Sequence, residues 1–200
     1  SVLAAALRDM HEEGVEHLVC AGDITNLAME SEFALAASVF SAFGPPQCMT
    51  FCPGNHDVYV KGQEKAQLFL DYFGDYCVSD VPGRSPRGDG FPVIQLRGGI
   101  LFLVLNSGRP NTAAGEVGRD QWEAAREMID SDAGRALVSK ARFRVLVQHH
   151  PAQNPSVRGT SWVRQLGHGN RDWPRLGEFA RKHKFDLVVH GHLHKPYRGK

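Results

Sequence analysis

Apolar residues recur along the chain with two different periods, and each period predicts a type of secondary structure. Spacings of three and four residues are typical of amphipathic helices, and Leu3, Leu7 and Met10 follow this rule. Short, nearly continuous apolar runs bounded by Gly, Pro, Asn or Asp instead predict buried strands. We therefore expect helices over residues 1–13, 30–41, 64–72, 120–129 and 176–183. We expect strands over residues 15–21, 47–52, 91–96, 100–106, 143–148 and 185–189.

The order of these elements predicts the fold class. Strands and helices alternate, and the strands are almost wholly apolar, which indicates an α/β fold with helices on both faces. Residues 97–99 predict a tight hairpin turn, Asp120 is expected to cap the helix that it leads, and residues 154–172 predict a long polar loop. With 200 residues, 42% of them hydrophobic, residues 1–200 are expected to form one domain.

Side chains that can bind metals or move protons directly follow four of the predicted strands. They are Asp23, Asn55, His56, Asp57, His149, His150, His190, His192 and His194. Since α/β sheets build their sites at the carboxyl ends of strands, we expect these side chains to converge. Oxygen and imidazole donors suit borderline transition metals such as Mn, Fe, Zn or Co. A carboxylate can also bridge two cations, which is the two-metal arrangement for attack on phosphorus.

The cysteines point away from a structural zinc site. Cys20, Cys48, Cys52 and Cys77 do not follow a zinc-binding spacing. Cys48 and Cys52 lie in one predicted strand, about 13 Å apart at the rise of a strand, which is too far for a disulfide. We therefore expect four reduced thiols in the core, which favours a cytoplasmic protein.

The charges are unevenly distributed although the formal net charge is only +1. Residues 135–200 hold 14 of the 23 Lys and Arg residues but 3 of the 22 Asp and Glu residues. Such a basic region suits phosphate-bearing partners, and solvated basic helices explain it equally well. Because the charges are dispersed, the sequence disfavours a nucleic-acid partner. No apolar run approaches the roughly 20 residues of a membrane-spanning helix.

Four short motifs, each placed after an apolar strand, together resemble the calcineurin-like metallophosphoesterase superfamily. They are Gly22-Asp23, Gly54-Asn55-His56-Asp57, His149-His150-Pro151 and Gly191-His192-Leu193-His194. Their order and their position after strands make the combination specific, although each motif alone is weak. The His-His-Pro motif and residues 115–129 are most similar to the bacterial cyclic-nucleotide phosphodiesterase type.

The resemblance implies a two-sheet αββα sandwich that binds two divalent or trivalent transition-metal ions (Mn, Fe or Zn). In that family pattern, Asp23 matches the carboxylate that bridges the two ions. Asn55, His149 and His192 match the other ligands of one ion, and His194 matches a ligand of its partner.

The resemblance also implies a phosphoesterase that hydrolyses a small phosphodiester, such as a cyclic nucleotide, by attack of a metal-bound hydroxide. His56 matches the catalytic residue that faces the scissile phosphate, and Asp57 matches its orienting partner. His150 is expected to line the substrate pocket. Three other activities of the superfamily stay open as alternatives: a phosphomonoesterase, a lipid-precursor pyrophosphatase and a nuclease. The sequence also leaves open whether the protein forms an oligomer.

One motif of the family is missing from its usual place. The family opens with Asp-x-His at the end of its first strand, whereas Asp9-Met10-His11 lies on a predicted helix. We therefore expect that strand and its two ligands upstream of Ser1, and the closing strands beyond the C-terminus. The incomplete ligand set also leaves open a non-enzymatic scaffold that binds protein partners.

The histidines outside these motifs are expected to have ordinary roles. His17 and His183 lack a strand-end position and are expected on the surface, and His168 is expected in the polar loop. His190 is expected to pack against the sheet or to support the site rather than bind metal.

Overall fold

The computed structural model describes residues 2–58, 63–152 and 169–194. Its α-helices are α1 (Val2–Glu12), α2 (Glu30–Ser41), α3 (Asn55–Val58), α4 (Gln63–Phe73), α5 (Arg119–Asp130), α6 (Asp132–Lys140) and α8 (Trp173–Lys182). Its strands are β1 (Leu18–Cys20), β2 (Met49–Phe51), β3 (Val93–Arg97), β4 (Ile100–Val104), β5 (Phe143–Val147) and β6 (Leu187–Val189). Short 3₁₀ helices, η1 (Pro46–Cys48) and η2 (Gly74–Cys77), precede β2 and follow α4. Every helix and strand expected from the apolar periodicity is present, and the strands are shorter than expected.

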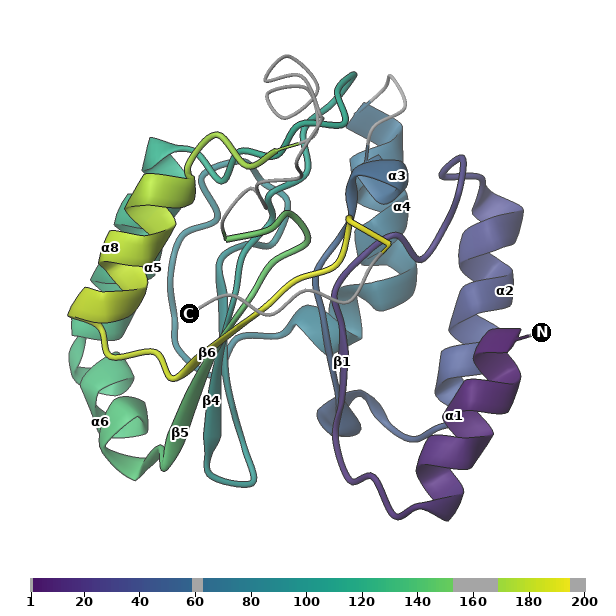
Figure 1. Cartoon of the computed structure of the whole chain (residues 1–200), viewed down its shortest axis with the longest axis horizontal. Helices are drawn as coiled ribbons and strands as arrows, with labels where there is room; N and C mark the ends of the chain where they lie inside the picture. Colours follow the sequence, from purple (N-terminus) through teal and green to yellow (C-terminus); the bar gives the residue numbers. More distant parts are fainter. Residues whose placement is uncertain (1, 59–62, 153–168, 195–200) are drawn as a thin grey trace, which may run out of the picture.

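The described strands form two sheets that lie between two layers of helices (Figure 1). β1 pairs with β2 in parallel. The larger sheet has the order β3-β4-β5-β6, in which β3 is antiparallel to β4 and the other pairs are parallel. Helices α1, α2 and α4 pack outside the small sheet, while α5, α6 and α8 cover the outer face of the large one. The expected α/β class and αββα sandwich are therefore confirmed.

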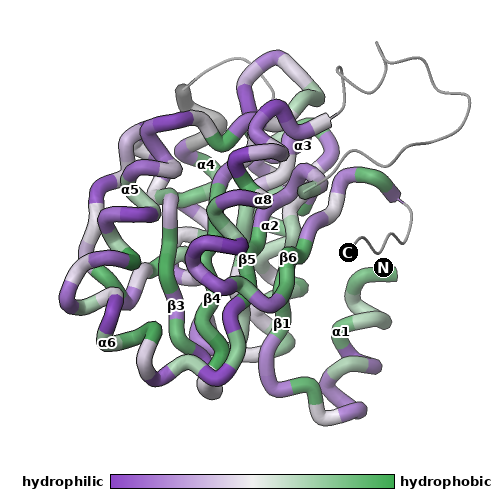
Figure 2. The backbone as a smooth tube through the Cα atoms, turned by 60° about the vertical axis from the view of Figure 1, so that its left-hand side comes forward, coloured by the Kyte–Doolittle hydropathy of each residue, from purple (hydrophilic) through white to green (hydrophobic). Residues whose placement is uncertain are grey.

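Strand β4 shows how both faces of the large sheet are buried. Leu101 and Leu103 pack with α5 and α8 on one side, whereas Phe102 and Val104 pack toward the small sheet on the other. Because successive residues of a strand face opposite sides, a strand covered on both sides must be apolar throughout. In the hydropathy view the central strands are accordingly mostly green, while purple segments lie on the outer helices (Figure 2).

Helices α3 and α6 are the α-helices that the apolar pattern does not predict. Helix α6 is nine residues long, holds Gly134 and has only two large apolar side chains, Leu137 and Val138. Its start is set instead by Ser131, whose hydroxyl accepts a hydrogen bond from the N–H of Gly134 at 3.0 Å, as an N-cap does. A side chain at Gly134 would collide with the carbonyl oxygen of Met128, so this glycine lets α6 pack closely on α5.

Two helices begin at different residues from those expected. The prediction that Asp120 caps α5 was wrong, because the N-cap residue is Gly118 and Asp120 lies in the first turn. A carboxylate there still interacts favourably with the helix dipole. Helix α8 begins at Trp173, earlier than expected, because Pro174 fits the first turn of a helix and does not break it.

The four cysteines are free thiols, as expected. Cys52 and Cys77 are buried in the core, while Cys20 and Cys48 are half-buried and pack against it. In the part of the chain that the structure describes, no helix is both long and apolar enough to cross a membrane.

Candidate metal centre

Four side chains meet after strands that belong to both sheets. Asp23 follows β1, Asn55 begins α3 after β2, His149 follows β5 and His192 follows β6. The Nε2 atom of His149 lies 3.1 Å from Oδ1 of Asn55 and 3.2 Å from Nδ1 of His192. The same Nε2 lies 3.2 Å from Oδ2 of Asp23, and Oδ1 of Asn55 lies 2.9 Å from Nδ1 of His192. We call these four residues the donor cluster.

The hydrogen bonding of His149 shows that the donor cluster fits a cation. Its Nδ1 lies 2.7 Å from the carbonyl oxygen of Ala21, which places the proton on Nδ1 because a carbonyl only accepts. Nε2 therefore carries the lone pair, and it faces the amide oxygen of Asn55 and the carboxylate of Asp23. A protein carbonyl that fixes the histidine tautomer in this way is typical of metal ligands. Two imidazoles, an amide oxygen and a carboxylate suit a transition-metal ion.

Tight backbone packing brings the donor cluster together. A Cβ atom at Gly54 would collide with the carboxylate of Asp23, and one at Gly22 would lie 2.7 Å from Nδ1 of His149. Asp23 and His192 have left-handed backbone angles, with φ of 56° and 68°. Such angles are uncommon outside glycine, and they turn the chain sharply at the ends of β1 and β6.

Asp57 is fully buried and joins the loops that follow β1 and β2. Its Oδ1 accepts hydrogen bonds from the N–H and the hydroxyl of Thr25, both at 2.8 Å. Its Oδ2 accepts from the N–H of Gly54 at 2.8 Å and of Ile24 at 3.3 Å. Burial raises the pKa of Asp57, while the hydrogen bonds from Gly54 and Thr25 oppose this shift. The contribution of Thr25 was not predicted, because a threonine after a turn looks like an ordinary capping residue.

His56 is half-buried and contacts the loop after β1 through different atoms. Its Nδ1 lies 2.8 Å from the carbonyl oxygen of Asn26, which places a proton on Nδ1. Its backbone N–H donates to Oδ1 of Asp23 at 3.0 Å. Asp57, expected as the orienting partner of this imidazole, forms its hydrogen bonds with Thr25 and with backbone N–H groups instead. Asp57 therefore fixes the loop after β1, in which the carbonyl oxygen of Asn26 contacts the ring of His56.

The protonation states favour oxygen and nitrogen ligands over sulfur. Burial raises the pKa of Asp23, but the hydrogen bond and charge that His149 supplies when it is protonated, together with the N–H of His56, outweigh burial, so the net pKa is lowered. Asp23 is thus a carboxylate, the form that binds metals. Burial raises the pKa of Cys20 to about 12 and that of Cys52 well above its usual range. Both cysteines, at the ends of β1 and β2, therefore stay neutral thiols.

His150 lies behind the donor cluster, with an exposed fraction of 0%. Its Nδ1 is 2.9 Å from the hydroxyl oxygen of Ser107, and its Nε2 is 3.1 Å from the carbonyl oxygen of Ala113. Burial, and then the neighbouring His149, lower its pKa to about 3, so the ring is neutral. The structure thus does not bring His150 to the position expected for a substrate contact. The centroid of its ring lies instead 4.4 Å from that of His192. Ser107 was overlooked, although it follows β4 as the other site residues follow their strands.

His194 is the expected ligand that the structure leaves outside the donor cluster. It is exposed, with φ of 51°, and within the described residues no hydrogen bond joins its ring to the cluster. His190 is half-buried, and its Nδ1 lies 3.1 Å from the carbonyl oxygen of Gly191. Asp9 and His11 are exposed on α1, which confirms that they do not follow a strand.

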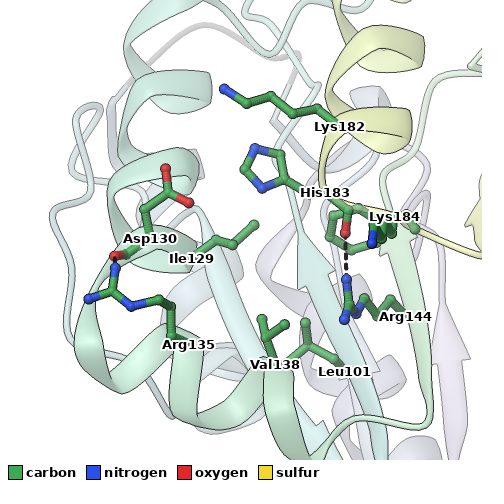
Figure 3. Close-up of a pocket in the computed structure, with 10 residues that line it drawn as sticks. Leu101, Ile129, Asp130, Arg135, Val138, Arg144, Lys182, His183 and Lys184 are labelled. Atoms are coloured by element: carbon green, nitrogen blue, oxygen red, sulfur yellow. Dashed lines mark hydrogen bonds between the residues drawn. The ribbon is translucent and has the colours of Figure 1, made fainter.

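His17 and His183, which were expected on the surface, are both half-buried. The ring of His17 stacks on Phe102 at a centroid distance of 5.0 Å, and its Nε2 is 2.9 Å from Oγ1 of Thr50. His183 lines a pocket of about 260 Å³ at the amino ends of β4 and β5, where Arg144 donates to its carbonyl oxygen at 2.8 Å (Figure 3). Its Nε2 is buried and has no hydrogen-bond partner within the described residues. This pocket lies at the opposite end of the large sheet from the donor cluster.

The polar loop expected over residues 154–172 falls mostly outside the described residues, which exclude 153–168 and hence His168. Its last residues pair with the segment that leads into α5. The N–H of Arg171 donates to the carbonyl oxygen of Gly115 at 2.8 Å. The N–H of Gly115 donates in turn to the carbonyl oxygen of Gly169 at 2.9 Å. The end of the loop therefore fixes the chain that precedes α5.

Comparison with known proteins identifies the class to which this fold and site belong. A family model described as calcineurin-like phosphoesterase matches residues 1–196, and the chain therefore belongs to that family. It is also 24% identical over 203 residues to a probable cyclic nucleotide phosphodiesterase of Rhodopseudomonas palustris. That match covers 98% of this chain and 64% of the relative, so the chain spans somewhat less than two-thirds of the relative's length. The family resemblance expected from the four motifs is confirmed.

Proposed function

We propose that this protein is a metal-dependent phosphodiesterase that acts on a small substrate of the cyclic-nucleotide type. The observation that carries the proposal is the convergence on Nε2 of His149 of donor atoms from Asn55, His192 and Asp23 within 3.2 Å. Family membership and the probable cyclic nucleotide phosphodiesterase among its relatives support the reaction class. The four free thiols favour a cytoplasmic location.

The donor cluster would hold one transition-metal ion, and the exposed His194 is assigned to a second ion that shares Asp23. Bound ions of this kind supply Lewis acidity, which lowers the pKa of water and offsets charge on the phosphoryl oxygens. Mn, Fe and Zn all suit the donor set. His149 keeps its lone pair on Nε2 because Ala21 accepts the proton of Nδ1.

His56 is the residue that we assign to the phosphoryl group and the leaving oxygen. Its Nδ1 proton is directed at Asn26, so Nε2 is the ring atom assigned to the substrate. With a second proton on Nε2, the imidazolium would donate a hydrogen bond to a phosphoryl oxygen or pass that proton to the leaving alkoxide. Asp57 and Thr25 would hold this histidine in place through the loop after β1.

The proposal is tested by the hydrolysis of bis(p-nitrophenyl) phosphate with added Mn²⁺, together with metal analysis of each protein. We expect His56→Ala to lower kcat about 100-fold or more, as for the loss of a hydrogen bond to the charge that develops on a phosphoryl oxygen, while its metal content stays unchanged. His11→Ala is the matched control, because His11 is an exposed histidine on α1, and it should leave both quantities unchanged.

Two results would contradict this proposal. A parent protein that binds no transition metal would exclude the metal centre and favour a scaffold. A parent protein that binds metal and hydrolyses p-nitrophenyl phosphate but not the diester would make it a phosphomonoesterase.

A further inference from the structure

Another cavity, with a volume of about 630 Å³, is lined mainly by the segment that connects β4 to α5 and by the first residues of α5. Val58, the last residue of α3, lines it, and α3 begins with the donor residue Asn55. Gly108 also lines it, and a Cβ atom there would lie 3.2 Å from the carbonyl oxygen of Gly54. Helix α3 thus contributes one residue to the cavity and another to the donor cluster. We call it the β4–α5 pocket, and its volume is typical of small-molecule sites.

The charges around the β4–α5 pocket are balanced. Its charged lining residues are Arg87, Arg109, Arg119, Asp89, Glu116 and Asp120. The guanidinium of Arg87 is occupied by the protein, since it donates to the carbonyl oxygens of Asn106 at 3.3 Å, Glu116 at 3.0 Å and Val117. A balanced set of charges suits a neutral group with several donors and acceptors better than a second phosphate.

Arg109 and Arg119 are the rim cations that remain available to a ligand, and Arg109 is the one that directly follows Gly108, beside Gly54. The guanidinium of Arg109 pairs with Glu116 and its side chain is 39% exposed, whereas that of Arg119 pairs with Glu123 and is 78% exposed. Nη1 of Arg171 lies 3.8 Å from the carboxylate of Glu116, so Glu116 holds two arginines at once. An arginine held in this way can stack on a base or donate to a sugar hydroxyl. Val58, Pro110 and Val117 provide apolar surface against which the flat face of a base could pack.

We propose that the β4–α5 pocket binds a neutral, nucleoside-type organic group of the phosphodiester, and that Arg109 determines the preference for it. The inference rests on the proposed function, since the phosphate would lie at the donor cluster. In a cyclic nucleotide one nucleoside carries both ester oxygens and stays on the phosphate after one bond is cleaved, so it needs a binding surface beside the cluster. The β4–α5 pocket offers the required size, neutral charge and mixed polar and apolar lining.

The experiment compares two substrates that share the p-nitrophenolate leaving group. Thymidine 5′-(p-nitrophenyl phosphate) retains a nucleoside, whereas methyl p-nitrophenyl phosphate retains a methyl group. We expect Arg109→Ala to lower kcat/KM for the thymidine ester about tenfold, mainly through KM, as for one lost charged hydrogen bond. The methyl ester should react as before. Arg84→Ala, which removes an exposed arginine paired with Glu127 outside the pocket, should affect neither substrate.

Binding of thymidine alone, followed by saturation-transfer NMR, separates this inference from the proposed function. Saturation transfer to thymidine that is seen in the parent protein and lost in Arg109→Ala would support the pocket. This holds even if neither ester is hydrolysed, because absent hydrolysis would overturn only the proposed phosphodiesterase activity. An equal loss of activity on both esters would assign Arg109 to the metal centre and overturn the inference. Absence of transfer in the parent protein would overturn it as well.

Discussion

The carboxylate of Asp57 binds Thr25 twice, through the backbone N–H and the hydroxyl, each at 2.8 Å. Thr25 follows the donor residue Asp23 by two positions, and Asp57 follows the donor residue Asn55 by two positions. This single pair of side chains therefore ties together the two loops that place the oxygen ligands of the donor cluster. Because Asp57 is fully buried, any loss of these bonds leaves polar groups without water as a substitute.

Asp57→Asn should weaken metal binding although Asp57 is not a ligand. The amide keeps the size of the carboxylate but loses one of the two acceptor oxygens that face Thr25, Ile24 and Gly54. We expect a loss of Mn²⁺ affinity of about 10- to 100-fold, as for other groups that support ligands, measured by titration calorimetry. Asp75→Asn, at an exposed aspartate after α4, should bind Mn²⁺ as the parent protein does.

Gly54→Ala should disrupt the centre by steric contact alone. The new methyl group would collide with the carboxylate of Asp23. This carboxylate cannot shift without straining the two tight loops. We expect the free energy of unfolding to fall by about 1–3 kcal/mol and metal content to be lost, measured by urea denaturation and metal analysis. At Gly74 a methyl group meets nothing within 4 Å, so Gly74→Ala should retain the metal. An unchanged metal content in Gly54→Ala would refute the close approach.

Metal should stabilise the folded protein through the donor cluster. Free Mn²⁺ at 100 times its dissociation constant should raise the free energy of unfolding by about 2.7 kcal/mol, and EDTA should reverse the gain. His192→Ala removes Nδ1, which lies 3.2 Å from Nε2 of His149, and should abolish most of the shift. Thermal denaturation with and without Mn²⁺ measures both effects, and a full shift in His192→Ala would count against His192 as a ligand.

His183→Phe should stabilise the protein, most clearly in mild acid. Burial lowers the pKa of His183, partly opposed by Asp130, so the folded state disfavours its protonation. The unfolded state then binds more protons as the pH falls below about 6.5, and stability is lost as the pH falls toward the folded pKa. Phenylalanine removes both this loss and a buried nitrogen that has no partner within the described residues.

Urea denaturation at pH 7.5 and pH 5 tests this substitution. We expect a gain of about 1 kcal/mol at pH 7.5 from removal of the unpaired nitrogen, and a larger gain at pH 5. The stability of the variant should still depend partly on pH through His17, because burial and Arg97 lower the pKa of this histidine as well. A destabilised variant at both pH values would show that His183 has a favourable partner.

The sequence was sufficient for helices whose large apolar residues recur on one face. Helix α2 spans residues 30–41 as expected, because Phe33 and Phe40 lie on one apolar face that is buried. Helix α6 depends on the Ser131 cap and on a close approach at Gly134, and apolar spacing detects neither.

For the candidate site, the rule that polar residues after strands converge was sufficient for Asp23, Asn55, His149 and His192. It could not distinguish a ring nitrogen that meets the other donors from ring nitrogens that are bound by other partners, as in His150. That difference depends on hydrogen bonds to Ser107 and Ala113, which approach from other parts of the chain. The role of Asp57 likewise follows from contacts 32 and 33 residues away in sequence.

The left-handed backbone at Asp23, His192 and His194 means that stability and chemistry favour different residues at the same positions. A side chain in this conformation costs about 1 kcal/mol or more relative to glycine, which adopts it freely. A selection for heat resistance alone would therefore tend to enrich glycine at these three positions and yield robust proteins without the proposed ligands. Any programme to stabilise this fold should hold these positions constant and seek its gains elsewhere, as at His183.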